Sequence, residues 1–175
     1  TAYRLQRHVC IRDRVRRTIP DATALLVSGV ATPANVGLLA YAGVDLVDDH
    51  RAALAGTRGR YLDATGETFL EDREELPCAC AACRQPREAF TREDCVEHNV
   101  AALEAELATV REHVRAGTLR EYLDGQVRQQ PWQTAALRRF DQEADHVRER
   151  TPLFRGSQLL ATPEDSLLRP AVARF

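Results

Sequence analysis

The chain has 175 residues, of which 44% are hydrophobic and 29% are charged, and its formal net charge is −2. This composition is typical of a globular protein, and the near-neutral charge gives no overall electrostatic attraction for nucleic acid. No apolar run approaches the roughly 20 residues of a membrane span, so we expect no contact with a membrane. The basic residues are all arginine, which excludes a lysine nucleophile or Schiff base.

The N-terminal part of the chain predicts a helix followed by a short strand. Residues 1–19 show helical spacing, and Pro20 ends the pattern. The apolar run 23–28 ends at Gly29. Its length and its Gly and Pro neighbours favour a buried strand.

A second helix and a second strand follow at once. Thr32 and Pro33 predict a helix start, with Thr as the N-cap, and Gly43 suits the position after a helix over 34–42. Residues 44–48 predict the second strand. A strand–helix–strand order with short loops predicts parallel strands. Two strands alone cannot make a stable parallel sheet with both faces covered, so we expect a larger α/β fold or pairing with another chain.

Residues 60–70 predict a β-hairpin. Two segments of strand-like composition, 60–63 and 67–70, flank a loop that contains Gly66. The cysteine-rich segment follows this hairpin directly.

A long helix is predicted after the cysteines. Thr91 and Asp94 form a capping box, with Phe90 as the hydrophobic staple, and Gly117 ends the helix. Its predicted apolar stripe consists of Val96, Val100, Leu103, Leu107, Val110 and Val114.

Two further helices are predicted before an irregular tail. One starts at Thr118 and continues to Val127, and the next opens at Pro131 and continues to Val147. Residues 151–175 contain several prolines and show no strong period.

Three of the five cysteines lie within six residues, as Cys78-x-Cys80-x-x-Cys83. This crowding suits metal coordination in a reducing compartment better than a disulfide framework, so we expect a cytoplasmic zinc protein. The three thiolates can reach one ion from a single loop, and tetrahedral Zn²⁺ then needs a fourth nitrogen or sulfur ligand.

His98 is the predicted fourth ligand, because it lies in the first turns of the capped helix. Cys95, three residues earlier, shares its helix face and is the rival, whereas His113 lies too far along the helix. The alternative without metal is that Cys80 and Cys83 are buried thiols and His98 is a hydrogen-bonded helix histidine. Four protein ligands leave no open position, so we expect a structural zinc that contributes on the order of 10 kcal/mol to folding.

Five motifs occur in a fixed order along the chain: Gly29-Val-Ala-Thr-Pro33, Gly43-Val-Asp-Leu-Val-Asp48, Gly59-Arg-Tyr-Leu62, Leu76-Pro-Cys-Ala-Cys-Ala-Ala-Cys83 and His98-Asn99. This order resembles the archaeal tRNA-guanine transglycosylases of the archaeosine pathway. The later segments 120–128 and 132–135 are most similar to archaeosine synthase, a paralogue within this family. The resemblance covers nearly the whole chain.

The resemblance implies an α/β fold, a partial TIM (β/α)8 barrel of which the chain holds the last strands and helices. Residues 1–62 are expected to be the C-terminal part of the barrel, 63–98 a zinc-binding subdomain, and 99–175 a helical C-terminal segment that completes the barrel. A whole barrel needs about 250 residues. Most of the base pocket is therefore expected upstream, which agrees with the incomplete strand–helix–strand unit.

The resemblance also implies a catalytic role for Asp48, because the transglycosylases use the aspartate at this position to attack the ribose carbon. Asp48 follows a strand, where barrel enzymes carry catalytic groups, and we expect like charges on Asp45 and Asp49 to raise its proton affinity. Alternatively, Asp48 or Asp49 caps the following helix. The family pattern has serine at position 49, and the Asp49-His50 pair found here favours the synthase.

The implied function is that of a fragment of an archaeal tRNA-modifying enzyme in archaeosine biosynthesis, acting on a 7-deazaguanine base in the tRNA D-arm. We expect the fragment alone to be inactive. The alternatives are a base-exchanging transglycosylase and a zinc-stabilised interaction module without catalysis, and a homodimer is a further expectation. Four arginines either contact tRNA phosphates or form a salt-bridged surface with nearby acidic residues: Arg120, Arg128, Arg138 and Arg139.

Overall fold

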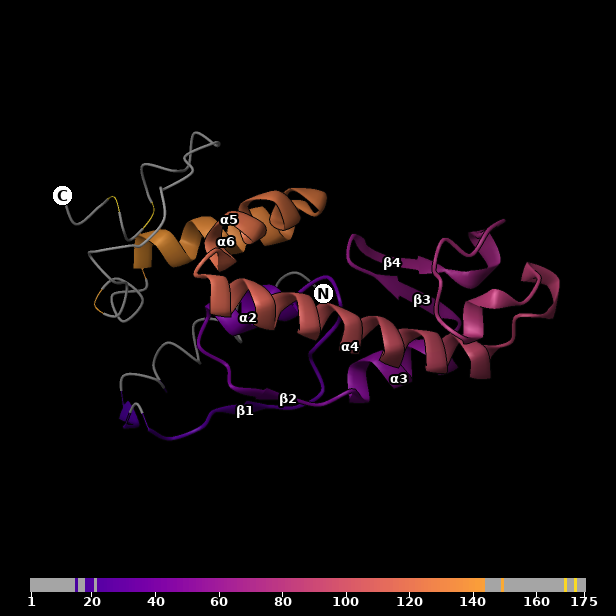
Figure 1. Ribbon diagram of the computed structural model, residues 1–175, viewed down its shortest axis with the longest axis horizontal. Helices are drawn as coiled ribbons and strands as arrows, with labels where there is room; N and C mark the ends of the chain where they lie inside the picture. The colour runs from indigo at the N-terminus through magenta and orange to yellow at the C-terminus, as the bar shows by residue number, and fades with distance from the viewer. Residues whose placement is uncertain are drawn as a thin grey trace.

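The computed structural model describes residues 15, 18–20, 22–143, 149, 169 and 172. Its strands and helices are β1 (Leu26–Val27), α2 (Val36–Tyr41), β2 (Leu46–Val47), α3 (His50–Thr57), β3 (Arg60–Asp63), β4 (Gly66–Phe69), α4 (Arg92–Ala116), α5 (Leu119–Gln126) and α6 (Pro131–Glu143). Short 3₁₀ turns lie at η1 (Leu70–Asp72), η2 (Ala82–Arg84), η3 (Arg87–Ala89) and η4 (Val127–Gln129). Figure 1 shows α4 as a long rod that runs below helices α5 and α6 at one end and below the β3–β4 hairpin at the other.

Strands β1 and β2 are parallel, with Leu26 opposite Leu46 and Val27 opposite Val47, and α2 connects them. The predicted strand–helix–strand unit is therefore confirmed. The expectation of a buried strand is wrong, because Leu26 is 59% exposed and Leu46 is 53% exposed. Within the part of the chain that the structure describes, this sheet has two strands and closes no barrel, so nothing there covers these two side chains.

Helix α2 begins at Val36, with Asn35 rather than Thr32 at the N-cap position. Asn35 accepts a hydrogen bond from the Thr32 backbone N–H (2.9 Å) and donates to the Val30 carbonyl (2.9 Å). These bonds organise Thr32–Asn35 as a turn before the helix, so the predicted N-cap lies three residues too early. The predicted end is confirmed, since Gly43 follows the helix with φ of 81°.

The β3–β4 hairpin is antiparallel, with Arg60 opposite Phe69 and Asp63 opposite Gly66, as predicted. Its loop is organised by the Asp63 carboxylate, which accepts hydrogen bonds from the backbone of Thr65 (2.9 Å) and Gly66 (3.0 Å). The hairpin leads directly into the cysteine loop.

Helix α4 begins with the predicted capping box between Thr91 and Asp94 and ends at Gly117, whose φ is 69°. Its buried face differs from the predicted apolar stripe, because Val114 is 56% exposed and three polar side chains are buried. The buried residues are Cys95, His98, Asn99, Leu103, Glu106 and Val110. The polar members face backbone and side-chain partners that lie far away in the sequence, so a count of apolar residues could not identify them.

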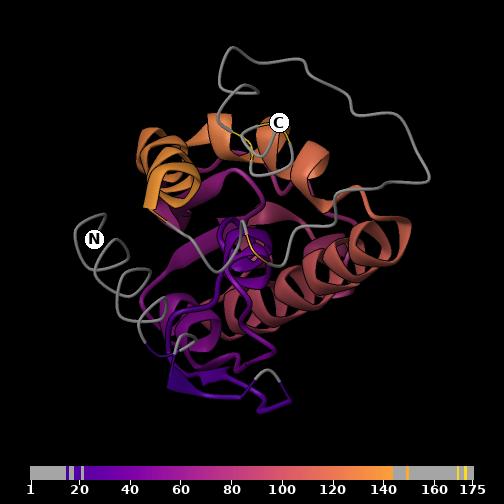
Figure 2. The same cartoon turned by 90° about the vertical axis from the view of Figure 1, so that its left-hand side faces the viewer.

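Helices α2, α3 and α4 enclose the main hydrophobic core, and a second core lies between α2 and α6. Figure 2 shows α2 between α4 and the layer formed by α5 and α6. The predicted starts of α5 and α6 are confirmed. The predicted continuation to Val147, the predicted irregular tail and most of the predicted helix 1–19 lie outside the described residues, although Val15 and Thr18 are helical.

Among the helices that the structure describes, none combines the length and the apolar composition needed to cross a membrane.

We predict that Gly56→Ala destabilises the protein, because α3 contacts α4 closely at this residue. A Cβ atom on Gly56 would lie 2.5 Å from the Cα of Val96 and 2.6 Å from its backbone nitrogen. Such overpacking costs about 1–3 kcal/mol, and urea denaturation should show this loss in the free energy of unfolding.

The matched control is Gly125→Ala in α5, where a Cβ atom meets nothing within 4 Å. This variant should be as stable as the wild type or gain up to about 1 kcal/mol of helix propensity. Equal stability of the two variants would contradict the close approach of α3 to α4.

Candidate functional site

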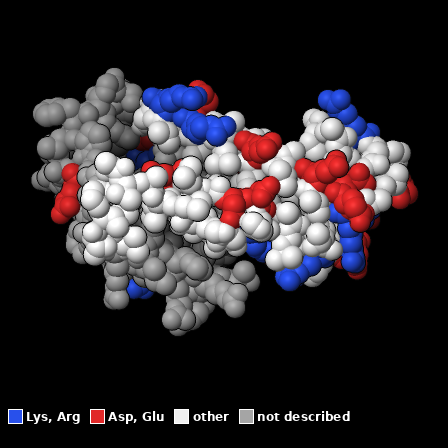
Figure 3. Space-filling model, turned by 90° about the horizontal axis from the view of Figure 1, so that it is seen from below, with Lys and Arg blue, Asp and Glu red and all other residues white. Residues whose placement is uncertain are grey.

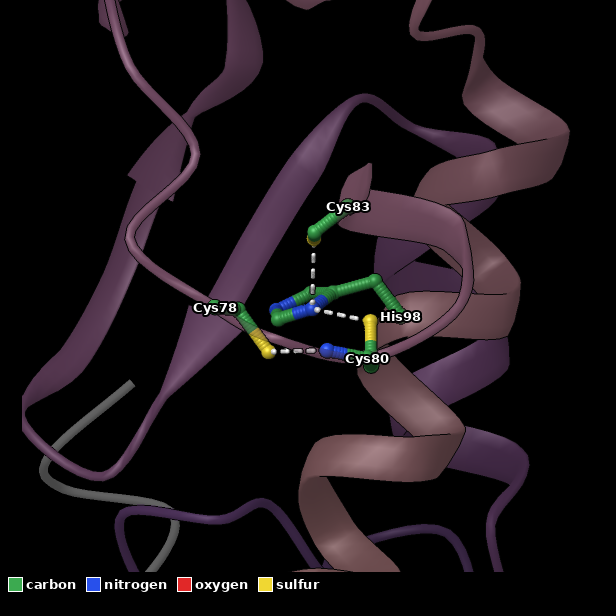
Figure 4. A group of neighbouring side chains, drawn as sticks. All are labelled: Cys78, Cys80, Cys83 and His98. Carbon is green, nitrogen blue, oxygen red and sulfur yellow. Dashed lines mark hydrogen bonds between the residues drawn. The ribbon is translucent and has the colours of Figure 1, made fainter. Parts of the chain in front are cut away.

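The structure brings Cys78, Cys80, Cys83 and His98 together. Their ligand atoms all lie within 4.8 Å of one another. Figure 4 shows the three sulfurs around the imidazole, with the cysteines on the loop after the hairpin and His98 on α4. Tetrahedral zinc with Zn–S bonds of about 2.3 Å needs ligand atoms about 3.8 Å apart, so a small contraction suits the cluster to this ion.

Short-range backbone contacts shape the cysteine loop. The backbone N–H of Cys80 donates to the Cys78 sulfur at 3.5 Å, and that of Cys83 donates to the Cys80 carbonyl at 3.1 Å. The second contact belongs to the turn that leads into η2, where Cys83 lies. With one residue between Cys78 and Cys80 and two between Cys80 and Cys83, the chain thus turns the Cys83 sulfur back toward the other two.

Helix α4 aims one ring nitrogen of His98 at the sulfurs. The His98 Nε2–H donates to the Leu62 carbonyl at 2.9 Å, which assigns the tautomer and leaves the Nδ1 lone pair free. Nδ1 lies 3.3 Å from the Cys83 sulfur and 3.5 Å from the Cys80 sulfur. Burial lowers the pKa of His98, so the ring is in the neutral form that binds metals.

The thiol of Cys83 suits a cation because its surroundings disfavour the thiolate charge. Burial raises the pKa of Cys83 to about 12, and the neighbouring Cys80 and Cys78 add to this rise. A divalent ion in their midst would supply the positive charge that three adjacent thiolates lack. The donor set therefore fits Zn²⁺.

Cys95, the rival fourth ligand, lies outside this cluster. It is fully buried on α4 and its sulfur faces the Arg60 carbonyl at 3.5 Å. His113, near the other end of α4, bonds Thr118 through Nδ1 at 2.8 Å. Of these three candidates the structure groups only His98 with the cysteines.

Two residues that support the cluster were not assigned a role from sequence. Asn99 accepts a hydrogen bond from the Leu62 backbone N–H at 2.8 Å and donates to the carbonyls of Arg60 (2.8 Å) and Ala52 (3.1 Å). Tyr61 stacks on the His98 ring with 3.8 Å between ring centroids. The motifs Gly59–Leu62 and His98-Asn99 contained both residues, but their mutual contacts depend on the tertiary fold.

Asp48 lies apart from the cysteines, directly after β2, and its side chain reaches across to the end of β1. One carboxylate oxygen accepts a hydrogen bond from the Ser28 hydroxyl and lies 3.3 Å from His50 Nδ1. The other accepts from the Gly29 backbone N–H at 2.8 Å. Neither Asp48 nor Asp49 caps α3 through its side chain: Asp49 occupies the N-cap position without a capping bond.

These contacts overturn the expected charge behaviour of Asp48. The Ser28 hydroxyl, followed by the Gly29 N–H and by His50, lowers the pKa of Asp48 to about 2, whereas like-charge repulsion was expected to raise its proton affinity. The Asp45 carboxylate accepts a hydrogen bond from the Leu25 backbone N–H at 2.7 Å. Asp48 is thus a half-exposed carboxylate that stays ionised at neutral pH.

Arg120 cannot contact tRNA phosphates, because it is buried and paired. It bonds Asp141 through two nitrogens (2.6 and 2.8 Å), Asp124 (3.0 Å) and the Tyr41 hydroxyl (3.0 Å), and Arg169 adds a second buried ion pair to Asp124. The other three candidate arginines lie at the surface: Arg128, Arg138 and Arg139. The described residues on the face in Figure 3 carry small groups of both charges rather than one continuous basic surface.

Comparison with known proteins identifies relatives of the chain. An archaeosine synthase of Haloferax volcanii is 53% identical over 167 residues, which cover 94% of this chain and 28% of the relative. An archaeosine synthase subunit alpha of Methanosarcina acetivorans is 45% identical over 169 residues, or 92% of this chain and 27% of the relative. A tRNA-guanine(15) transglycosylase of the same organism is 28% identical over 180 residues, or 99% of this chain and 36% of the relative.

The chain thus spans between about a quarter and about a third of the length of these relatives. The family model for queuine tRNA-ribosyltransferase, abbreviated TGT, matches residues 5–131, which is more than half of the chain. The resemblance inferred from the ordered motifs is confirmed, and the chain belongs to the queuine tRNA-ribosyltransferase family.

Proposed function

We propose that the chain is part of an archaeosine synthase, a tRNA-modifying enzyme that acts on a 7-deazaguanine base in the D-arm of tRNA. The observation that carries this proposal is the difference in identity between two groups of relatives: 53% and 45% to archaeosine synthases, against 28% and 29% to two tRNA-guanine(15) transglycosylases. The Asp49-His50 pair after the strand-end carboxylate supports the same choice. A cytoplasmic location is consistent with free thiols and with a tRNA substrate.

The proposed architecture is the closing part of a (β/α)8 barrel with a zinc subdomain. The parallel pair β1 and β2 supports it, since Leu26 and Leu46 expose apolar area that further barrel elements would cover. The division into 1–62, 63–98 and 99–175 remains a prediction, as does the homodimer.

The proposed cofactor is one structural Zn²⁺ held by Cys78, Cys80, Cys83 and His98. Four protein ligands would occupy all the coordination positions of a tetrahedral zinc. The zinc would therefore link the cysteine loop to α4 and take no part in the reaction. The loop packs through Leu76, Ala82 and the cysteines themselves. A metal held by these cysteines would therefore cross-link the loop at the residues through which it packs.

The proposed catalytic group is Asp48. Its lowered pKa keeps the carboxylate charged at neutral pH, which suits a group that stabilises or attacks positive charge at a ribose carbon, and Ser28 and Gly29 fix its orientation. If the chain is part of an archaeosine synthase, as proposed, the same carboxylate would contact the nucleotide that carries the modified base.

The zinc proposal predicts that Cys80→Ser removes the metal. Elemental analysis of the purified full-length protein should fall from about one zinc per chain to well below half, and the melting temperature should drop as the metal cross-link is lost.

The matched control is Cys95→Ser, which alters a buried cysteine of the same region without touching the cluster. Cys95→Ser should keep its zinc even if its melting temperature falls. Zinc loss in Cys95→Ser together with full retention in Cys80→Ser would reverse the ligand assignment.

The catalytic proposal predicts that Asp48→Asn in the full-length enzyme lowers archaeosine formation by about 100-fold or more, because the charge is lost while the shape is kept. Mass spectrometry of nucleosides from the treated tRNA measures the product. Asp49→Asn is the control, since Asp49 makes no capping bond, and should retain activity.

Normal turnover by Asp48→Asn would remove Asp48 from the chemistry. Rapid exchange of labelled guanine into tRNA by the wild-type enzyme would instead favour the base-exchanging alternative.

A further inference from the structure

We propose that Tyr61 is a positioning residue of the metal centre, holding the Cys83 thiolate with its hydroxyl and the His98 imidazole with its ring. This inference rests on the zinc site proposed above. Tyr61 belongs to β3 and is 1% exposed, so the packing around its side chain fixes its position.

The ring of Tyr61 limits the rotation of His98. The two rings are nearly parallel, with 15° between their planes and 3.8 Å between their centroids. The hydrogen bond from His98 Nε2 to the Leu62 carbonyl fixes one point of the imidazole, but a single bond allows the ring to turn about it. Stacking removes this freedom and keeps Nδ1 directed at the sulfurs.

The opposite face of the Tyr61 ring is also occupied. The guanidinium carbon of Arg73 lies 4.1 Å from the ring centroid, and because His98 covers one face, Arg73 takes the other. Arg73 is itself held by an ion pair with Asp63 at 2.7 Å. The order Arg73, Tyr61, His98 forms a layered stack that starts at the residue after η1, passes through β3 and ends at the cluster.

The hydroxyl of Tyr61 lies 3.6 Å from the Cys83 sulfur. When Cys83 is a thiolate it only accepts, so the phenol is the donor. A hydrogen bond of this kind draws electron density from the sulfur and holds it in place, as residues behind the ligands do in other metal sites. Cys83 is also buried, with 7% exposure, so the phenol is a substantial part of its surroundings.

The experiment uses the full-length protein loaded with zinc or with Co²⁺ and compares Tyr61→Phe with the wild type. Tyr61→Phe keeps the stack and removes only the hydroxyl. We expect zinc transfer to a chromogenic chelator to be faster by about tenfold or more. We also expect the sulfur-to-cobalt charge-transfer band to shift, because one thiolate loses its donor.

Tyr122→Phe is a closely matched control. Tyr122 also stacks on a histidine, with 4.4 Å between its ring and that of His113, and its hydroxyl bonds Glu106. This pair lies outside the cluster, so the variant should lose stability yet keep the wild-type release rate and cobalt spectrum.

A wild-type release rate and spectrum in Tyr61→Phe, with the metal bound, would overturn the role of Tyr61 alone. A wild-type protein that holds neither zinc nor cobalt stoichiometrically would overturn the metal site itself. Equal acceleration in both tyrosine variants would mean that general destabilisation controls release, and this would also overturn the role of Tyr61.

Discussion

Two adjacent polar side chains on α4, His98 and Asn99, hold β3 in the way that a neighbouring strand would. They make three short hydrogen bonds to the backbone of Arg60 and Leu62, and a longer one joins Asn99 to Ala52 on α3. A strand edge needs such partners, because an unpaired buried peptide group is costly. The cysteine–histidine cluster depends on this arrangement, because the same bonds that attach the hairpin to α4 also orient the ring of His98.

The chain separates two kinds of chemistry. The cysteine cluster is half-buried, packs near the aromatic rings of Tyr61 and Phe90, and offers three thiols and one imidazole as ligands. The Asp48 carboxylate is half-exposed at the ends of two parallel strands and is ionised by fixed donors. A cluster of metal-binding side chains beside the hairpin and a charged group at the strand ends agree with the proposed division of roles, in which the cluster stabilises the scaffold and the strand ends contact the substrate.

Local patterns in the sequence predicted what depends on near neighbours. The capping box at Thr91, the hairpin loop at Gly66, the helix ends at Gly43 and Gly117, and the grouping of three cysteines all involve partners within a few residues. What failed depended on distant partners. Arg120 is buried because Asp141 reaches it from another helix, and Asp48 is strongly acidic because Ser28 reaches it from another strand. The start of α2 is the exception, because Asn35 replaced Thr32 at the N-cap through bonds to Thr32 and Val30, which lie only three and five residues away.

Helix α4 also sets the rotation, about its own axis, of the hairpin relative to helices α5 and α6. Its 25 residues span about 37 Å, with His98 near the first turns and contacts to α5 near the last. In a continuous helix each residue advances the face by about 100°. A single inserted residue in the middle of α4 would therefore rotate the hairpin and its cysteines by more than a quarter turn relative to α5 and α6. The length of α4 in residues, and not only its composition, sets the direction in which the hairpin and the cysteine loop project.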